Sequence, residues 1–173
     1  MRSLLLVATC LTACGGRGPS GIPPPVSGPD GRPAETIDFA LPTLDGEIVQ
    51  LSRLRPRVVL VNYFATWAPP SLEDLPALSA LSDELPELAV VAVSMDLSPT
   101  ELLPPFLQVV PVSFPVVLAD DGTRQGYTPF GRVAAVPTSY LLDTRGRFVE
   151  VFHGATPIDH LRRRVIELSE EAR

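Results

Sequence analysis

The stretch that decides the fold reads Val58-Val59-Leu60-Val61-Asn62-Tyr63-Phe64-Ala65-Thr66-Trp67-Ala68-Pro69-Pro70-Ser71. Its first half is apolar with almost no alternation, which is typical of a strand buried on both faces of a sheet. Leucines then recur every three or four residues from Leu72 to Leu85, along one face of a predicted helix that Pro76 interrupts. A second apolar run at residues 88–95 predicts another buried strand. The order strand, helix, strand requires a crossover connection and parallel strands.

Turn and cap signals predict the remaining elements. Asp45-Gly46 lies between two short apolar segments and predicts an N-terminal hairpin, and Asp143-Thr144-Arg145-Gly146 predicts a second hairpin near the C-terminus. Ser98-Pro99-Thr100-Glu101 has the form of a helix start, but that helix meets Pro104 after one turn. A last helix is predicted to be capped by Thr156-Pro157-Ile158-Asp159, and its inner face is expected to carry Ile158, Leu161, Val165 and Leu168.

Two segments resemble a known family. Residues 62–71 resemble the active-site segment of thioredoxin-like proteins, especially the redoxin family of TlpA/ResA-like thiol-disulfide reductases of bacterial envelopes. Residues 134–143 resemble that family's cis-proline segment, with Pro137 as the proline. The family reads Trp-Cys-Pro-Pro-Cys where this chain has Trp67-Ala68-Pro69-Pro70-Ser71, so this is a degenerate member. The resemblance implies an α/β fold, a thioredoxin-like three-layer sandwich whose mixed central sheet is flanked by helices, with an N-terminal hairpin extension.

The N-terminal part predicts export and anchoring. Arg2 and the short apolar run that follows form a signal-like leader, and Leu11-Thr12-Ala13-Cys14 resembles a bacterial lipobox. We therefore expect a lipoprotein signal peptide at 1–13, a Pro/Gly-rich tether at 14–33 and a thioredoxin-like domain at 34–173. Cys14 would carry the lipid, and Gly15 after it favours the outer over the inner membrane. An ordinary secretory signal is the alternative to the lipobox. For the proline run of the tether, the alternative is a ligand for a proline-binding domain.

Composition excludes several function classes. The 173 residues carry 14 basic and 20 acidic side chains, for a formal charge of -6. An acidic chain without a basic stripe is a poor binder of nucleic acid, so no nucleic-acid partner is expected. Arg53, Arg55 and Arg57 alternate before the first buried strand, where a solvated loop is favoured over a basic patch for a partner.

The two cysteines, Cys10 and Cys14, both lie within the first 14 residues. The predicted domain therefore has no disulfide, no thiolate nucleophile and no cysteine-ligated metal. A thioredoxin-type reductase needs a thiolate near a helix N-terminus and a second thiol that resolves the mixed disulfide. Ala68 and Ser71 stand at those two positions, so no catalytic residue is assigned. Thiol-disulfide oxidoreductase, the activity of the family, remains as the disfavoured alternative.

Other polar candidates are weaker. Ser71 and Asp74 have the spacing of an S-x-x-D helix cap, which is favoured over a residual role of Asp74 in proton handling. His153 and His160 are the chain's two histidines. Two histidines alone make a weak metal site, so no metal and no cofactor are expected, although copper delivery remains a third function class.

Although the two thiols of the family's site are missing, a groove beside it is still predicted. Its residues are Trp67, Pro69, Pro70, Val136 and Pro137. A proline in the cis form keeps the preceding residue extended, so that its backbone can pair with an extended polypeptide. Trp67 would be an exposed aromatic anchor beside it. The sequence thus predicts a redox-inactive, lipid-anchored, periplasm-facing protein of the cell envelope that binds a protein or peptide partner. The alternative is that these residues persist only because the fold needs them.

Overall fold

The computed structural model describes residues 36–172. The leader, Cys14, the tether and the predicted start of the domain at residue 34 lie outside these residues and stay predictions. Within these residues, no helix combines the length and the apolar character needed to cross a bilayer.

A mixed five-stranded sheet forms the centre of the fold. Its strand order is β5-β4-β3-β8-β9, with β3, β4 and β5 parallel to one another and β8 and β9 joined by antiparallel pairing. This confirms the predicted mixed sheet of an α/β fold. The five strands are β3 (Val58–Phe64), β4 (Leu88–Ser94), β5 (Val116–Leu118), β8 (Thr138–Leu142) and β9 (Phe148–His153).

The alternation of side chains along β3 divides the core into two layers. All seven residues of β3 are buried, as the unbroken apolar run predicted. Val58, Leu60 and Phe64 belong to one hydrophobic cluster, whereas Val59, Val61 and Tyr63 belong to the cluster on the opposite face. Successive side chains in a strand point to opposite faces, so Asn62 shares the face of Leu60 and Phe64.

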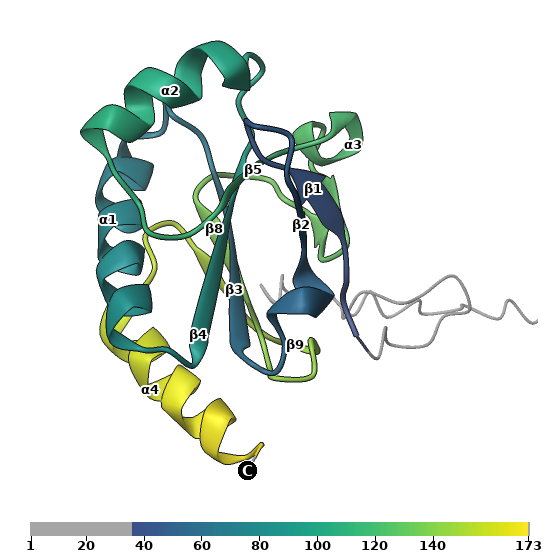
Figure 1. The fold of residues 1–173 in the computed structure, drawn as a ribbon, viewed down its shortest axis with the longest axis vertical. Coiled ribbons are helices and arrows are strands. Elements are labelled where there is room, and N and C mark those ends of the chain that lie inside the picture. The colour runs from purple at the N-terminus through teal and green to yellow at the C-terminus, as the bar shows by residue number, and fades with distance from the viewer. Residues whose placement is uncertain (1–35, 173) are drawn as a thin grey trace, which may run out of the picture.

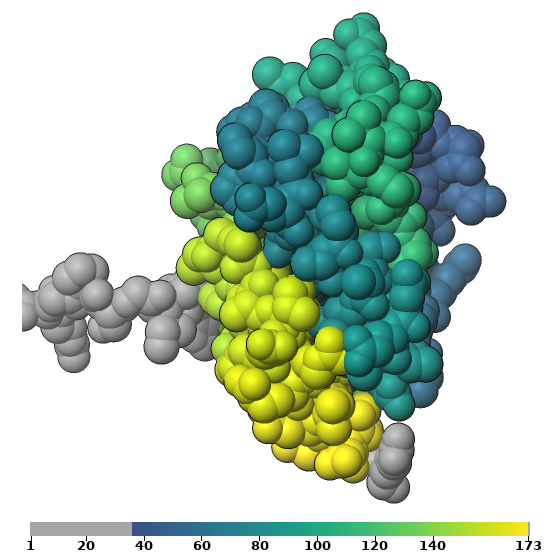
Figure 2. Space-filling model, turned by 90° about the vertical axis from the view of Figure 1, so that its left-hand side faces the viewer, coloured from purple at the N-terminus to yellow at the C-terminus, as the bar shows by residue number. Residues whose placement is uncertain are grey.

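Helices cover the face that contains Leu60 and Phe64. Figure 1 shows α1 (Pro69–Glu84), α2 (Pro99–Val109) and α4 (Ile158–Glu170) on the same side of the sheet. Figure 2 shows α1, in blue and teal, lying beside α4, in yellow. The predicted inner face of the last helix is confirmed at three of its positions, because Leu161, Val165 and Leu168 are buried.

Shorter segments cover the other face. The predicted N-terminal hairpin is present as β1 (Ala40–Pro42) and β2 (Ile48–Gln50), with Gly46 at a positive φ of 85° in its turn. A 3₁₀ helix η1 (Leu51–Leu54) follows and contributes the buried Leu51. The remaining short elements on the right of Figure 1 are α3 (Asp121–Arg124), β6 (Tyr127–Thr128) and β7 (Gly131–Arg132).

Two helices run past prolines. α2 begins at Pro99 as predicted but continues through Pro104 to Val109. A proline removes one backbone hydrogen bond, yet Leu103 is fully buried, and burial of an apolar face supplies most of a helix's stability in a protein. α1 likewise contains Pro76 and remains one helix from Pro69 to Glu84.

Candidate functional site

Trp67 and Ala68 follow the carboxyl end of β3 and lead directly into α1. The side chain of Trp67 is 70% exposed, whereas that of Ala68 is only 3% exposed. Ala68 is the N-cap residue, and prolines occupy the first helical positions, where the missing N–H costs no hydrogen bond. The sequence Trp-Ala-Pro-Pro therefore ends the strand and starts the helix within a few residues.

Ser71 lies inside the first turn of α1 and its side chain is fully buried. Its hydroxyl has no hydrogen-bond partner among residues 36–172. The predicted S-x-x-D cap is therefore wrong: the N-cap is Ala68, and no side chain caps the helix. The reason is that the two prolines start the helix three residues earlier than the cap pattern requires.

Pro137 immediately precedes β8, and its peptide bond with Val136 is cis, as predicted. The antiparallel register pairs Tyr63 with Thr138, so the start of β8 lies beside the end of β3. The tertiary structure thus brings the two segments of the predicted groove to the same end of the sheet. Val136 is half-buried, and neither of its backbone groups takes part in a hydrogen bond within residues 36–172.

A buried network of polar side chains connects β3, α1, β8 and the segment before α4. The Asp74 carboxylate accepts a hydrogen bond from the Thr156 backbone N–H at 2.7 Å and one from Asn62 Nδ2 at 2.8 Å. Asn62 Nδ2 also donates to Ser139 Oγ at 2.8 Å, and Ser139 Oγ lies 3.0 Å from Thr156 Oγ1. Burial raises the pKa of Asp74, and the hydrogen bonds from Thr156 and Asn62 offset only part of this effect.

The sequence did not predict this network. Thr156 was expected to cap α4, but its backbone and its hydroxyl both bind Asp74, and the N-cap residue of α4 is Pro157. The signal that could have pointed to the network is a single amide, Asn62, within an otherwise apolar strand. A polar residue buried in a sheet requires hydrogen-bond partners, but the sequence does not say where they are.

A second buried carboxylate holds the segment before Trp67. Asp96 is fully buried and accepts hydrogen bonds from the Thr66 backbone N–H at 3.1 Å and from Thr66 Oγ1 at 2.8 Å. Ser94 Oγ donates to its other oxygen at 2.8 Å. Asp96 was not singled out from the sequence, and its effect is to fix the backbone from which Trp67 projects.

The exposed part of the site is apolar. The Met95 backbone N–H donates to the Phe64 carbonyl at 2.8 Å, so the chain leaves β3 and β4 at the same end of the sheet. Leu97, two residues further, is 87% exposed. At the two positions where the family carries thiols, Ala68 has no heteroatom and the hydroxyl of Ser71 is fully buried.

Neither histidine belongs to a cluster of metal-ligating side chains in the described part of the chain. Within residues 36–172 no group of three or more His, Cys, Asp or Glu side chains is placed to hold a metal ion. His153 Nδ1 lies 3.5 Å from Thr138 Oγ1, and His160 Nε2 lies 3.0 Å from Glu150 Oε1. Each ring therefore already has a protein partner.

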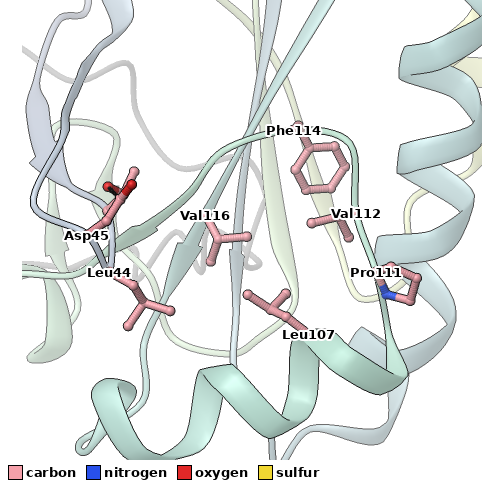
Figure 3. A pocket seen from close by; sticks show the side chains of 8 residues that line it. Leu44, Asp45, Leu107, Pro111, Val112, Phe114 and Val116 are labelled. Carbon is pink, nitrogen blue, oxygen red and sulfur yellow. Dashed lines mark hydrogen bonds between the residues drawn. The ribbon is translucent and has the colours of Figure 1, made fainter.

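A pocket of about 320 Å³ lies away from these residues. Figure 3 shows its lining, which comes from the β1–β2 turn, the end of α2 and the chain leading into β5. No residue of the predicted groove contributes to it. Its lining is mainly apolar, and Asp45 is the only acidic side chain among the residues that line it: Thr43, Leu44, Asp45, Leu107, Pro111, Val112, Phe114 and Val116.

Comparison with known proteins places the chain in a family. The model of the AhpC/TSA family matches residues 33–151. The thioredoxin-like protein YneN of Bacillus subtilis is 32% identical over 120 residues, which cover 68% of each chain. The thiol-disulfide oxidoreductase ResA of Bacillus cereus is 30% identical over 121 residues, covering 69% of this chain and 68% of ResA.

A solved structure agrees with these matches. It comes from Chlorobium tepidum and is described as a candidate thiol:disulfide interchange protein DsbE. It superposes with a TM-score of 0.67 and 28% identity, covering 78% of this chain and 94% of the other. The chain has a thioredoxin-like fold and belongs to the AhpC/TSA family, among relatives that include thiol-disulfide oxidoreductases.

Proposed function

We propose that this chain is a redox-inactive member of its family that binds a polypeptide partner through the predicted groove. The proposal includes a lipid anchor on Cys14, a place in the cell envelope facing the periplasm, and preference for the outer membrane. The leader and the lipobox-like pattern support the anchor. The names of the relatives support a thioredoxin-like fold in a family that includes thiol-disulfide oxidoreductases.

The exposure of Trp67 is the observation that carries the proposal. A tryptophan side chain that is 70% exposed leaves a large apolar area in water, and such side chains are favoured anchors in protein interfaces. Leu97 follows Asp96, which binds Thr66, and at 87% exposed it is a second exposed apolar side chain at this end of the sheet. The two positions that bear thiols in the family, in contrast, are buried as Ala68 and Ser71.

The backbone of Val136 offers a second kind of contact. Its N–H and C=O have no hydrogen-bond partner within residues 36–172, and the residue is half-buried beside the end of β3. An extended peptide that adds alongside an open backbone segment gains main-chain hydrogen bonds, while side-chain contacts provide specificity. Trp67 and Val136 together would therefore bind a short extended segment of a partner protein.

The competing function is thiol-disulfide exchange, the activity named for ResA. That reaction breaks one disulfide and forms another through a mixed disulfide, and it needs a thiolate in the enzyme. Residues 15–173 contain no cysteine. Turnover of a disulfide substrate by the full chain carrying Cys10→Ser and Cys14→Ser would contradict the proposal.

Site-specific photo-crosslinking in native envelopes tests the binding role. A photoreactive amino acid replaces Leu97, which is exposed at the groove end, and a control probe replaces Ile166, which is 43% exposed on α4. We expect a discrete protein adduct from position 97 that is absent from position 166. Equal capture from both positions, or no capture from position 97, would show that the groove has no partner.

A Trp67→Ala variant carrying the same probe at position 97 identifies the anchor. Loss of a central aromatic anchor costs about 2 kcal/mol or more of binding free energy, so adduct formation at limiting partner concentration should fall at least tenfold. Leu72→Ala, an exposed apolar change on α1, is the matched control and should leave the adduct largely unchanged. Equal loss in both variants would argue against a specific role of Trp67.

A further inference from the structure

Arginines from two separate segments gather at the end of the sheet opposite Trp67. Arg53, Arg55 and Arg57 lie in and after η1, just before β3 begins at Val58. Arg145 and Arg147 lie in the turn between β8 and β9. The register pairs Val59 with Leu142, which places the start of β3 beside the end of β8.

The two arginine segments touch each other. A Cβ atom added at Gly146 would collide with the guanidinium of Arg55, so the turn lies directly against the residue that follows η1. We call the five side chains Arg53, Arg55, Arg57, Arg145 and Arg147 the basic end. They are five of the chain's 14 basic residues, and the chain as a whole has a net charge of -6.

Three of these charges are available for an external partner. Arg53, Arg57 and Arg145 are exposed, and within residues 36–172 their guanidinium groups have no hydrogen bond or ion pair. Arg147 donates to Asp143 at 2.7 Å, and Arg55 donates to the Ile37 carbonyl at 3.3 Å. A cluster in which most guanidinium groups face solvent repels itself, and an anion would relieve that repulsion.

Two carboxylates beside the arginines are already held by the protein. Asp143 accepts hydrogen bonds from the backbone N–H groups of Arg145 and Arg147, and Asp38 accepts them from Gln50 and the Ser52 N–H. Glu87, just before β4, is another acid at the start of the parallel strands, and it has a partner as well. These acids therefore only partly neutralise the five arginines.

The described chain begins at the same end. The Ile37 backbone N–H donates to the Gly146 carbonyl at 2.7 Å, so the segment that leads back to Cys14 joins the domain beside the arginine-bearing turn. In Figure 1 the described chain enters at the lower right, below β1.

We propose that the basic end docks on anionic lipid headgroups. Guanidinium groups bind phosphate oxygens through paired N–H donors, and clustered basic residues near a membrane are attracted by its negative surface potential. A lipid surface is favoured over nucleic acid because the cluster occupies one end of an acidic domain, next to the point where the proposed anchor segment joins it.

Docking in this way would orient the domain. Trp67 follows the carboxyl end of β3, whereas the basic end precedes its amino end, about 20 Å away at about 3.3 Å per residue. The groove would then face away from the membrane, toward proteins in the aqueous space. Docking of the basic end does not require the groove to have a partner, so it can fail or succeed separately from the proposed function.

Partitioning onto vesicles tests the proposal without the lipid anchor. The full chain carrying Cys14→Ser is titrated with vesicles of phosphatidylcholine alone and with vesicles that also contain phosphatidylglycerol. The measured quantity is the ratio of the two partition coefficients at low salt. The apolar leader is present in every variant and with both vesicles, so the ratio reports the attraction of charged groups to the anionic lipid.

Two double charge reversals provide a matched comparison. Arg53→Glu with Arg145→Glu alters the basic end, whereas Arg132→Glu with Arg163→Glu makes the same change in net charge at exposed arginines elsewhere. Each basic residue near an anionic surface contributes roughly fivefold to binding, so the first pair should lower the ratio by more than tenfold. The second pair should lower it by less than about threefold, through the general change in charge.

The outcomes separate the possible sources of binding. Equal loss in both double variants would show a general charge effect and overturn the proposal, as would no loss in either. Binding that persists unchanged at high salt would also overturn it, because exposed charges are screened within about 8–10 Å at moderate ionic strength. Thermal unfolding of each variant checks that it is folded, and Arg57→Glu replaces Arg145→Glu if the turn does not tolerate the change.

Discussion

Asp74 shows how one carboxylate holds several elements of this fold together. It projects from α1 and binds Asn62 of β3 and Thr156 before α4, while Asn62 continues the contacts to Ser139 of β8. A buried carboxylate is costly unless it is well hydrogen-bonded, and here burial still raises its pKa. Asn62 Oδ1 accepts no hydrogen bond among residues 36–172, so the network is one donor short.

The first prediction concerns Asp74→Asn. Because the pKa of Asp74 is raised in the folded protein, its contribution to stability is full below the ordinary aspartate pKa and is lost as pH rises through the folded value. The neutral amide cannot titrate, and a turned Asn62 amide would offer its free Oδ1 to the new N–H. We expect the difference in free energy of unfolding, variant minus wild type, to increase as the pH rises from about 3 to about 7.

Urea unfolding across this pH range measures the difference. Asp83→Asn, which removes an exposed carboxylate from the same helix, serves as the control. A stability difference between wild type and Asp74→Asn that does not change with pH would show that Asp74 is not a buried titrating group.

α1 matters most among the helices because its first turn carries the Pro69 to Ser71 part of the candidate site. Its N-terminal residues are Pro69, Pro70 and Ser71, and its buried side chains face the sheet. Leu75, Leu78 and Leu81 belong to the same hydrophobic cluster as Leu60 and Phe64 of β3. The spacing of these leucines explains why the helix keeps its place despite Pro76, since packing replaces the missing backbone hydrogen bond.

The second prediction tests this packing with Leu78→Ala. Leu78 is fully buried, and a leucine truncated to alanine in a core costs about 2–5 kcal/mol through lost transfer free energy and the remaining cavity. Leu72→Ala on the same helix, where the side chain is 46% exposed, should cost less than about 1 kcal/mol. Chemical denaturation monitored by circular dichroism gives both values. Comparable losses at the two positions would mean that α1 is not held mainly by this face.

At the scale of the whole molecule, the fold stands without any covalent cross-link. Both hydrophobic clusters lie within residues 36–172, and each is built from residues of several strands together with the segments that cover one face. No cysteine lies between residues 15 and 173. Packing of the two faces of a five-stranded sheet therefore replaces the cross-linking that a disulfide would provide.

The third prediction follows from this absence of thiols. The midpoint of thermal unfolding of the full chain should be the same, within about 1 °C, with and without a thiol reductant, because no structural disulfide is broken.

A variant carrying Ala68→Cys and Ser71→Cys supplies the contrast. Its two thiols, three residues apart at the start of α1, should form a disulfide that is reducible and should support turnover of a disulfide substrate.

Each half of this comparison can fail separately. A reductant-dependent midpoint in the unaltered chain would contradict the absence of a structural disulfide. A double-cysteine variant that forms the disulfide but turns over no substrate would show that more than the two thiols has been lost from the site.

The sequence by itself determined the sheet-forming runs, the N-terminal hairpin, the inner face of α4 and the absence of thiols from the domain. Hydrophobic periodicity and turn residues act over a few positions, so β3, β4 and Asp45-Gly46 could be recognised locally. The cis peptide at Pro137 was foreseen only through the family resemblance. The helix cap at Ser71 was mispredicted because the pattern S-x-x-D also fits a residue one turn inside a helix that starts at a proline.

Only the tertiary structure decided which polar groups meet. Asn62 and Ser139 are 77 positions apart, and Asp74 and Thr156 are 82 apart, so their contacts depend on strand register and on how α1 crosses the sheet. The same holds for the basic end, where Arg55 lies against a turn from a distant hairpin. Partners that are remote in sequence leave no local pattern, because the strand register and the packing of the helices decide which side chains become neighbours.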